Sequence, residues 1–214
     1  MKLLFRTVAA FALVAAGATA MAQERATATF RDAQGKRIGA ARLEQTPGGV
    51  LIQLDVVGLP PGEHAFHIHE KGACHWQDGF QSAGGHFAPQ GKPHGYHGSD
   101  GHHAGDMPNQ YAAKDGRMRS DVFVPDVQLS VASLLDPDGS ALVLHANGDD
   151  YRSQPSGAAA DRIACAVIRR GAPGRPVARA LPGLAPGVPS AGSPRAADRR
   201  HGNARNVVRS AYPA

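Results

Sequence analysis

Nine of the eleven histidines lie between Gly62 and Asp106, and their spacing restricts the folds open to this chain. His67 and His69 alternate in an apolar, strand-like segment, whereas most of the others follow along a glycine-rich stretch. Residues two apart on a strand face the same side, so these two present their imidazoles together. Paired imidazoles on a rigid strand form half of a nitrogen-ligand metal site. The fold must therefore place a strand beside a long histidine-bearing loop.

A second set of residues has the spacing of a closed metal cage. Three imidazoles and one carboxylate suit tetrahedral Zn²⁺ and leave no open position, which is typical of a structural site. A further histidine, His145, ends another strand-like run and could add a third ligand to the strand pair. A loosely metal-binding histidine tract is the alternative, but these residues are spaced out rather than consecutive. The four cage residues are His86, His94, His103 and Asp106.

The remaining histidines are expected not to bind metal. His64 would face away from His69 on a strand, which favours a buried, hydrogen-bonded side chain. His102 adjoins His103 and could exchange roles with it. We expect solvent-exposed side chains at His75, His97 and His102, and no role for His201 in the C-terminal tail.

Short alternating segments predict an all-β fold. Seven runs of β-type residues are separated by turn sequences, and no segment of ten or more residues in the body has a helical period. We therefore expect an antiparallel sandwich or barrel with one long loop at residues 71–116 and a second at 146–161. Metal ligation could hold so long a loop without regular structure. The runs are residues 26–31, 38–44, 50–57, 62–70, 117–124, 141–145 and 162–168.

The N-terminus has the layout of a secretory signal peptide. Lys2 and Arg6 supply a positive start, an apolar run follows at residues 7–16, and Ala20-Met21-Ala22 offers a small-x-small cleavage site. The run is too short for a membrane span of about 20 residues. An uncleaved anchor is the alternative. We expect residues 1–22 to be removed and the mature protein to be periplasmic or secreted.

The two cysteines, Cys74 and Cys165, are candidates for a disulfide bond. Export would place them in an oxidising compartment, where pairing is favoured over metal ligation. Closing a loop of about 90 residues would stabilise the fold by roughly 4 to 5 kcal/mol on the chain-entropy model. Two free, buried thiols are the alternative.

The net charge of +5 is divided unevenly along the chain. Residues 23–168 carry 12 Lys and Arg against 17 Asp and Glu, whereas residues 169–214 carry nine Arg and one acid, Asp198. This tail is rich in Pro, Gly and Ala and cannot bury enough surface to offset its ordering entropy. We expect one folded domain at 23–168 and a disordered basic tail at 169–214. The basic charge thus gives no reason to expect nucleic-acid binding by the folded domain.

Five segments together resemble the copper, zinc superoxide dismutases, especially the exported bacterial ones. The resemblance covers residues 26–168 and implies an eight-stranded antiparallel Greek-key β-barrel. It also implies a long zinc-binding loop and a second loop beside the active site. The segments are Gly62 to Glu70, Gly84 to Pro89, His103 to Asp106, Leu142 to Asp150 and Arg162 to Ile168.

The resemblance also implies roles for individual residues. His86 would bridge the two metals, and Asp149 would hydrogen-bond one ligand of each, with Asp150 as its rival. Arg162 matches the arginine that guides the anion, although an ordinary surface ion pair is the alternative. Copper would be held by His67, His69, His86 and His145, and zinc by His86, His94, His103 and Asp106.

The activity implied by the resemblance is the conversion of two superoxide anions and two protons to dioxygen and hydrogen peroxide. One copper and one structural zinc per subunit would serve this antioxidant reaction. Family members occur as monomers and as dimers, so a homodimer is one of two expected states, and no membrane span is expected. The tail either contacts an anionic surface or has no role. The competing function is a non-catalytic periplasmic protein that binds and buffers copper on the same fold.

Overall fold

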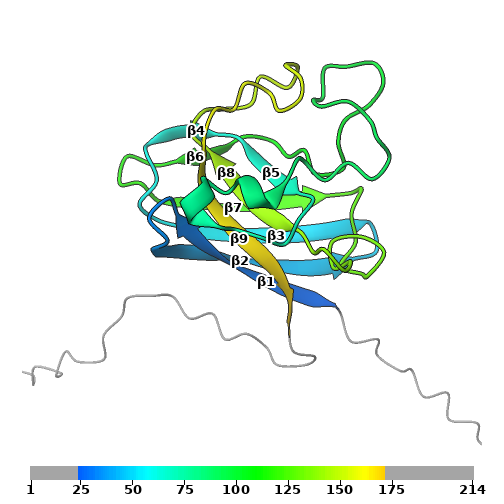
Figure 1. The fold of residues 1–214 in the computed structure, drawn as a ribbon, viewed down its shortest axis with the longest axis horizontal. Helices are drawn as coiled ribbons and strands as arrows, with labels where there is room; N and C mark the ends of the chain where they lie inside the picture. Colours follow the sequence, from blue (N-terminus) through cyan, green and yellow to red (C-terminus); the bar gives the residue numbers. More distant parts are fainter. Residues whose placement is uncertain (1–23, 172–214) are drawn as a thin grey trace, which may run out of the picture. The chain divides into compact units, whose positions relative to one another are not determined.

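The computed structural model describes residues 24–171. The predicted signal peptide and residues 172–214 of the predicted tail lie outside the described part. Between these limits the chain forms nine strands and two short 3₁₀ helices, η1 and η2 (Figure 1). No helix within residues 24–171 is long and apolar enough to cross a membrane.

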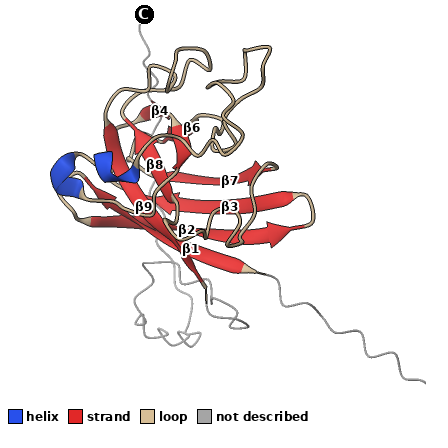
Figure 2. Cartoon of the chain, turned by 45° about the vertical axis from the view of Figure 1, so that its right-hand side comes forward, coloured by secondary structure: helices blue, strands red, loops and turns tan. Residues whose placement is uncertain are grey.

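The strands form one seven-stranded antiparallel sheet and one two-stranded sheet. The large sheet has the order β5-β8-β9-β1-β2-β3-β7 and curves around the core, while β4 pairs with β6 (Figure 2). The all-β prediction is confirmed. The strands are β1 (Arg25–Asp32), β2 (Arg37–Thr46), β3 (Gly49–Val56), β4 (Gly62–His64), β5 (Phe66–His69), β6 (Gln110–Ala112), β7 (Met118–Val124), β8 (Ala141–His145) and β9 (Arg162–Arg170), with η1 at Trp76–Asp78 and η2 at Gln81–Ala83.

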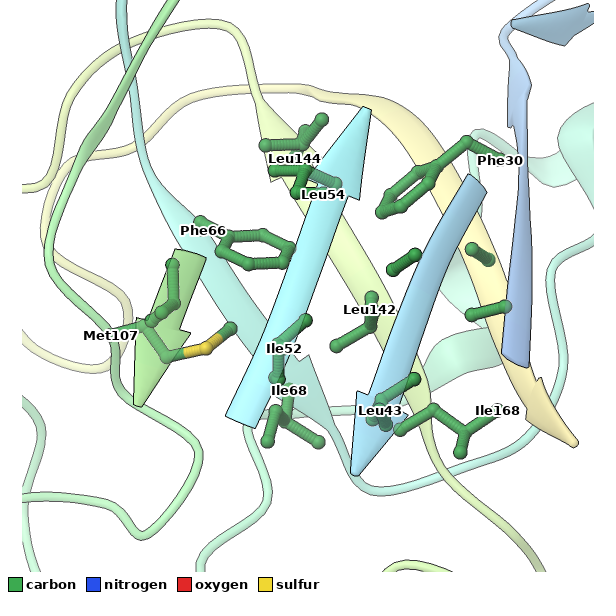
Figure 3. Packing of buried hydrophobic residues seen from close by; sticks show 14 of the residues in the cluster. Phe30, Leu43, Ile52, Leu54, Phe66, Ile68, Met107, Leu142, Leu144 and Ile168 are labelled. Atoms are coloured by element: carbon green, nitrogen blue, oxygen red, sulfur yellow. The ribbon is translucent and has the colours of Figure 1, made fainter. Parts of the chain in front are cut away.

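Alternation of apolar side chains explains why these segments form a curved sheet. In β1 every second residue from Ala26 to Phe30 is buried and the residues between them are exposed. Such a pattern buries one face of a strand and leaves the other in water. The buried faces meet in a core that includes Phe30, Leu54 and Phe66 (Figure 3). This core fixes the strands on which the histidines lie.

The predicted strand at residues 62–70 is two strands, which raises the seven predicted runs to eight, and β6 is the ninth strand. β4 pairs with β6, whereas β5 pairs with β8 in the other sheet. Between them, the amide of Ala65 donates to the carbonyl of Asn147. The apolar pattern continues through Ala65, where the chain passes from one sheet to the other, so the sequence did not reveal that the segment is two strands.

The predicted loop at residues 71–116 contains more regular structure than expected. β6 lies within it, and η1 and η2 lie near its start. Three residues are too few to show a strand alternation, which is why β6 escaped prediction. The start of the loop is joined to β9 by a disulfide between Cys74 and Cys165, as expected from the cysteine count.

Candidate metal centre

Two adjacent strands carry three of the predicted site histidines to one face of the sheet. On β5, Phe66 and Ile68 enter the core, so His67 and His69 face the opposite side. β8 alternates in the same way, and His145 at its end lies on the side away from Leu144. The register of β8 against β9 shifts between Leu144 and His145, which is a β-bulge position that can redirect a side chain.

The free edge of β5 positions two further site residues by backbone pairing. The amide of Phe87 donates to the carbonyl of Ile68, and the amide of Ile68 donates to the carbonyl of Gly105. These bonds set His86 opposite His69 and Asp106 opposite His67. A side chain at Gly105 would overlap the carbonyl of Ile68, so this close approach requires glycine. The loop is thus fastened along a strand edge.

Four buried ring nitrogens in the first histidine set lack hydrogen-bond partners. They are His67 Nδ1, His69 Nε2, His86 Nε2 and His145 Nε2. One ligand atom from each residue lies within 4.8 Å of the others. A buried polar atom without a partner costs about 1 to 3 kcal/mol. Four such nitrogens facing one another are therefore a donor set that a cation would satisfy, and imidazole suits copper.

The second set converges on one carboxylate oxygen. Asp106 Oδ1 lies 2.9 Å from His86 Nδ1 and from His94 Nδ1, and 3.4 Å from His103 Nδ1. The Nδ1 atoms of His86 and His103 are 3.3 Å apart. Ligands of a tetrahedral zinc at bond lengths near 2.0 Å are separated by about 3.3 Å. The set therefore fits zinc in number, chemistry and spacing.

His86 belongs to both sets through different nitrogens. Its Nδ1 faces Asp106, whereas its Nε2 is buried without a partner beside the first set. An imidazole can bridge two metals only through both ring nitrogens. The structure gives His86 the orientation that such a bridge needs.

Asp149 joins the two sets from the second long loop. Its Oδ2 lies 2.8 Å from His67 Nε2, and its Oδ1 lies 3.0 Å from His94 Nε2. A carboxylate behind a ligand imidazole fixes the orientation and tautomer of the ring. The rival Asp150 instead accepts hydrogen bonds from Arg152 and Ser153 on the exposed side of the loop. The geometry therefore favours Asp149 over Asp150.

Burial keeps most of the first set uncharged. Desolvation lowers the pKa of His86 to about 4 and that of His145 to about 3, and it also lowers the pKa values of His67 and His69. A neutral imidazole has a lone pair available for a metal. The first set is therefore in its ligand form near neutral pH.

His94 and Asp106 of the second set are instead held in their charged forms. Burial opposes charge on His94, but its hydrogen bonds with Asp106 and Asp149 raise its pKa to about 9. Burial likewise opposes ionisation of Asp106, yet hydrogen bonds from His103, His86 and His94 hold its pKa far below the usual range. Without metal, a proton on His94 takes the place of a cation at this carboxylate.

Arg162 lies at the edge of the first set and is fixed by the disulfide-linked loop. Its Nη1 donates to the carbonyl of Phe80 and its Nη2 to the carbonyl of Gly84, both at 2.7 Å. β-Sheet register pairs it with His145. Its charge contributes to the low pKa values of His69 and His145. The side chain is half-buried, and its described partners are carbonyl groups rather than the ion pair of the alternative interpretation.

The other described histidines lie outside both sets. His64 is buried, and its ring nitrogens lie 2.7 Å from the carbonyl of His145 and 2.8 Å from that of Pro60. This matches the buried, hydrogen-bonded side chain that we expected. His75 and His97 are exposed as predicted, but His102 is half-buried, with Nδ1 2.7 Å from the carbonyl of His103. His201 lies outside the described residues.

Sequence reasoning missed the residues that hold Asp149 in place. Asn109 makes two hydrogen bonds with the backbone of Asp149, and Gly157 packs directly against its carboxylate. Neither residue lies in a recognisable metal motif. The close packing of Gly157 and the pairing of Asn109 exist only in three dimensions, so no local signal could have revealed them.

Known proteins of one family are similar to this chain. The family model described as copper/zinc superoxide dismutase matches residues 37–168. The chain belongs to the copper/zinc superoxide dismutase family. A family member from Aquifex aeolicus, superoxide dismutase [Cu-Zn] 2, is 49% identical over 149 residues, which are 68% of this chain and 86% of the relative. The superoxide dismutase [Cu-Zn] of Caulobacter vibrioides is 45% identical over 149 residues, or 67% and 85% of the two chains.

The superoxide dismutase fold is also found in solved structures. A SOD-like protein from Bacillus subtilis aligns with a TM-score of 0.63 at 38% identity, covering 66% of this chain and 96% of that protein. The recognition of this superoxide dismutase family from sequence motifs is therefore confirmed, and so is the predicted barrel.

Proposed function

We propose that the protein is a superoxide dismutase that converts two superoxide anions and two protons to dioxygen and hydrogen peroxide. The observation that carries this function is the convergence of four unpartnered, buried histidine nitrogens beside an anchored arginine. Copper, when bound, supplies the one-electron couple that oxidises one superoxide and reduces the next. Family membership and the donor sets support copper and zinc as the two metals.

The proposed ligand assignment follows the two geometric sets. His86 would supply Nε2 to the copper set and Nδ1 to the zinc set, which would hold the ring in one orientation. We propose that His86 Nε2 takes a proton from water when it is not bound to copper and passes that proton to the reduced substrate. Copper would be held by His67, His69, His86 and His145, and zinc by His86, His94, His103 and Asp106.

Arg162 is proposed to bind and orient the superoxide anion. Its guanidinium is hydrogen-bonded to two carbonyl oxygens, which carry no full negative charge, and Asp78 acts on it only through a longer-range electrostatic interaction. A fixed positive charge in a cleft raises the local concentration and association rate of an anionic substrate. The charge lies beside His145, so the bound anion would be held next to the copper set.

A superoxide-scavenging assay on copper- and zinc-loaded protein tests the proposal. We expect activity in the wild type and its loss in His145→Ala, which removes one nitrogen of the copper set. Metal analysis of both proteins must accompany the assay. Copper-loaded wild type without activity would overturn the dismutase proposal and would favour a copper-binding, non-catalytic protein.

We further propose that residues 1–22 are a signal peptide and that the mature domain functions in the periplasm or outside the cell. The positive start, apolar run and cleavage sequence support this proposal. N-terminal sequencing of the exported protein should begin at Gln23. A retained N-terminus would contradict it.

The tail and the oligomeric state are separate proposals. Arg169 and Arg170 belong to β9, so the proposed contact with an anionic surface rests on the seven arginines of residues 172–214 and on charge alone. Salt-sensitive retention on anionic vesicles should distinguish the full chain from a chain ending at Gly171, and equal retention would leave the tail without this role.

The mass of the purified protein in solution decides between a monomer and a homodimer.

A further inference from the structure

Asp149 is held by a buried amide from another part of the chain. Asn109 Oδ1 accepts a 2.7 Å hydrogen bond from the amide of Asp149, and Asn109 Nδ2 donates a 2.9 Å hydrogen bond to its carbonyl. Both bonds are buried, and the exposed fraction of Asn109 is 9%. The side chain thus forms hydrogen bonds with both the amide and the carbonyl of Asp149, as the backbone of a neighbouring strand would. This arrangement fixes the position from which the carboxylate of Asp149 reaches His67 and His94.

Further contacts fix Asn109 itself. Its Nδ2 also donates to Glu63 Oε1 at 2.9 Å, and its backbone amide donates to the hydroxyl of Tyr151 at 2.8 Å. The hydroxyl of Tyr111 donates to the same oxygen of Glu63. Asn109 is therefore held by Glu63 of β4 and by Tyr151 in the loop that follows Asp149, and Tyr111 of β6 in turn holds Glu63. An amide with two fixed neighbours has little freedom to rotate or to move away.

We infer that Asn109 is a positioning residue for both metal sites, acting through Asp149. The carboxylate of Asp149 can orient a ring of each set only if its own backbone is fixed, and the structure gives this task to Asn109. The proposed route runs from Glu63 through Asn109 to Asp149 and then to His67 and His94. This inference rests on the proposed role of Asp149 in orienting the ligands.

Asn109→Ala should weaken zinc binding about tenfold, measured by competition with a chromophoric chelator. Copper should also be affected, which an altered electron paramagnetic resonance spectrum of the Cu²⁺ protein would report. The matched control is Gln110→Ala, because Gln110 is buried to a similar extent and adjacent, but its side chain donates its hydrogen bond to the carbonyl of Pro108 and not to Asp149. The control should change zinc affinity less than twofold.

A double-mutant cycle separates positioning from a general loss of stability. Asn109→Ala should have little further effect on zinc affinity when Asp149→Asn is already present. If Asn109 had a purely structural role, Asn109→Ala would lower the stability of the metal-free protein but leave zinc affinity and the copper spectrum unchanged. That result would overturn the inference. Additive losses of zinc affinity in the two variants would also overturn it.

Two outcomes keep this inference distinct from the proposed role of Asp149. If Asp149→Asn binds zinc as the wild type does, the role of Asp149 and this inference both fail. If Asp149→Asn loses affinity but Asn109→Ala does not, only the inference about Asn109 fails. Should Asn109→Ala not fold, Asn109→Asp preserves the shape and the acceptor but removes the donor, and it should give the same loss of affinity.

Discussion

Arg162 donates a 2.7 Å hydrogen bond to the carbonyl of Gly84, two residues before His86 in the chain. One loop therefore fixes both Arg162, the proposed guiding cation, and His86, the histidine shared by the two candidate metal sets. The disulfide at Cys74 ties the start of this loop to β9, three residues beyond Arg162. The proposed anion binding and metal binding would thus depend on the same short segment.

Replacing Arg162 by Ala should lower the second-order rate constant for superoxide about tenfold at low salt, because the guiding charge is lost. The rate constant of the wild type should fall as ionic strength rises, and that of the variant should change less. Pulse radiolysis over a range of salt concentrations measures both effects. Arg162→Lys preserves the charge but not the paired carbonyl contacts, so its rate should lie between the two. An Ala variant as fast as the wild type would exclude a guiding role.

Removing the disulfide should destabilise the metal-free protein by about 2 to 5 kcal/mol, because its absence frees a long loop in the unfolded chain. The two cysteines are 91 residues apart in the sequence. Urea unfolding of Cys74→Ala/Cys165→Ala against wild type gives this difference. The variant should also be less active when metal-loaded, since the carbonyls that hold Arg162 lie in the released loop. Unchanged unfolding would show that the remaining contacts alone secure the loop.

Without metals, stability should be greatest near pH 6.5. The pKa of His94 is raised to about 9, so its stabilising contribution is fully present below pH 6.5 and is lost as pH rises toward 9. The pKa of His86 is lowered to about 4 and that of His145 to about 3, because burial disfavours their charged forms. Their contribution to stability is therefore fully present above pH 6.5 and is lost as the pH falls toward these values. Denaturant midpoints at pH 5, 6.5 and 9 measure this profile.

The control for this pH dependence is His94→Asn, in which the loss of stability between pH 6.5 and 9 should be much smaller. Zinc binding to the wild type should release a proton below pH 9, because His94 must be deprotonated to become a ligand. Calorimetry in buffers of different ionisation enthalpy detects that proton. A titration without proton release would contradict the charged state assigned to His94.

Gly157→Ala should weaken zinc binding by tenfold or more. A β-carbon at Gly157 would overlap Asp149 Oδ1 and lie 2.7 Å from His94 Nε2, so it would displace the carboxylate from the ring. Chelator competition measures the affinity. Gly58→Ala is the matched control, because its φ of +77° resembles the +73° of Gly157 but its β-carbon would meet no atom within 4 Å. Equal zinc affinities in the two variants would mean that the steric contact is unimportant.

Much of the candidate site was predictable from the sequence. The alternation in Phe66-His67-Ile68-His69 follows from strand geometry, and the structure does place both histidines on the face opposite the core. The spacing from His86 to Asp106 predicted a four-residue cage, and these residues converge within hydrogen-bonding distances. Such patterns are local or chemical, so they can be seen before any folding is known.

The sequence by itself determined the all-β class, the candidate donor residues and the cysteine pair, because alternation, ligand chemistry and a count of two cysteines are properties of the chain. Only the tertiary structure decided that β4 and β5 separate at Ala65, that Asp149 rather than Asp150 reaches the rings, and that Asn109 holds it there. Asn109 and Asp149 are 40 residues apart and meet only when two loops pack together. Contacts of that kind depend on how the whole sheet closes, and no local pattern encodes them.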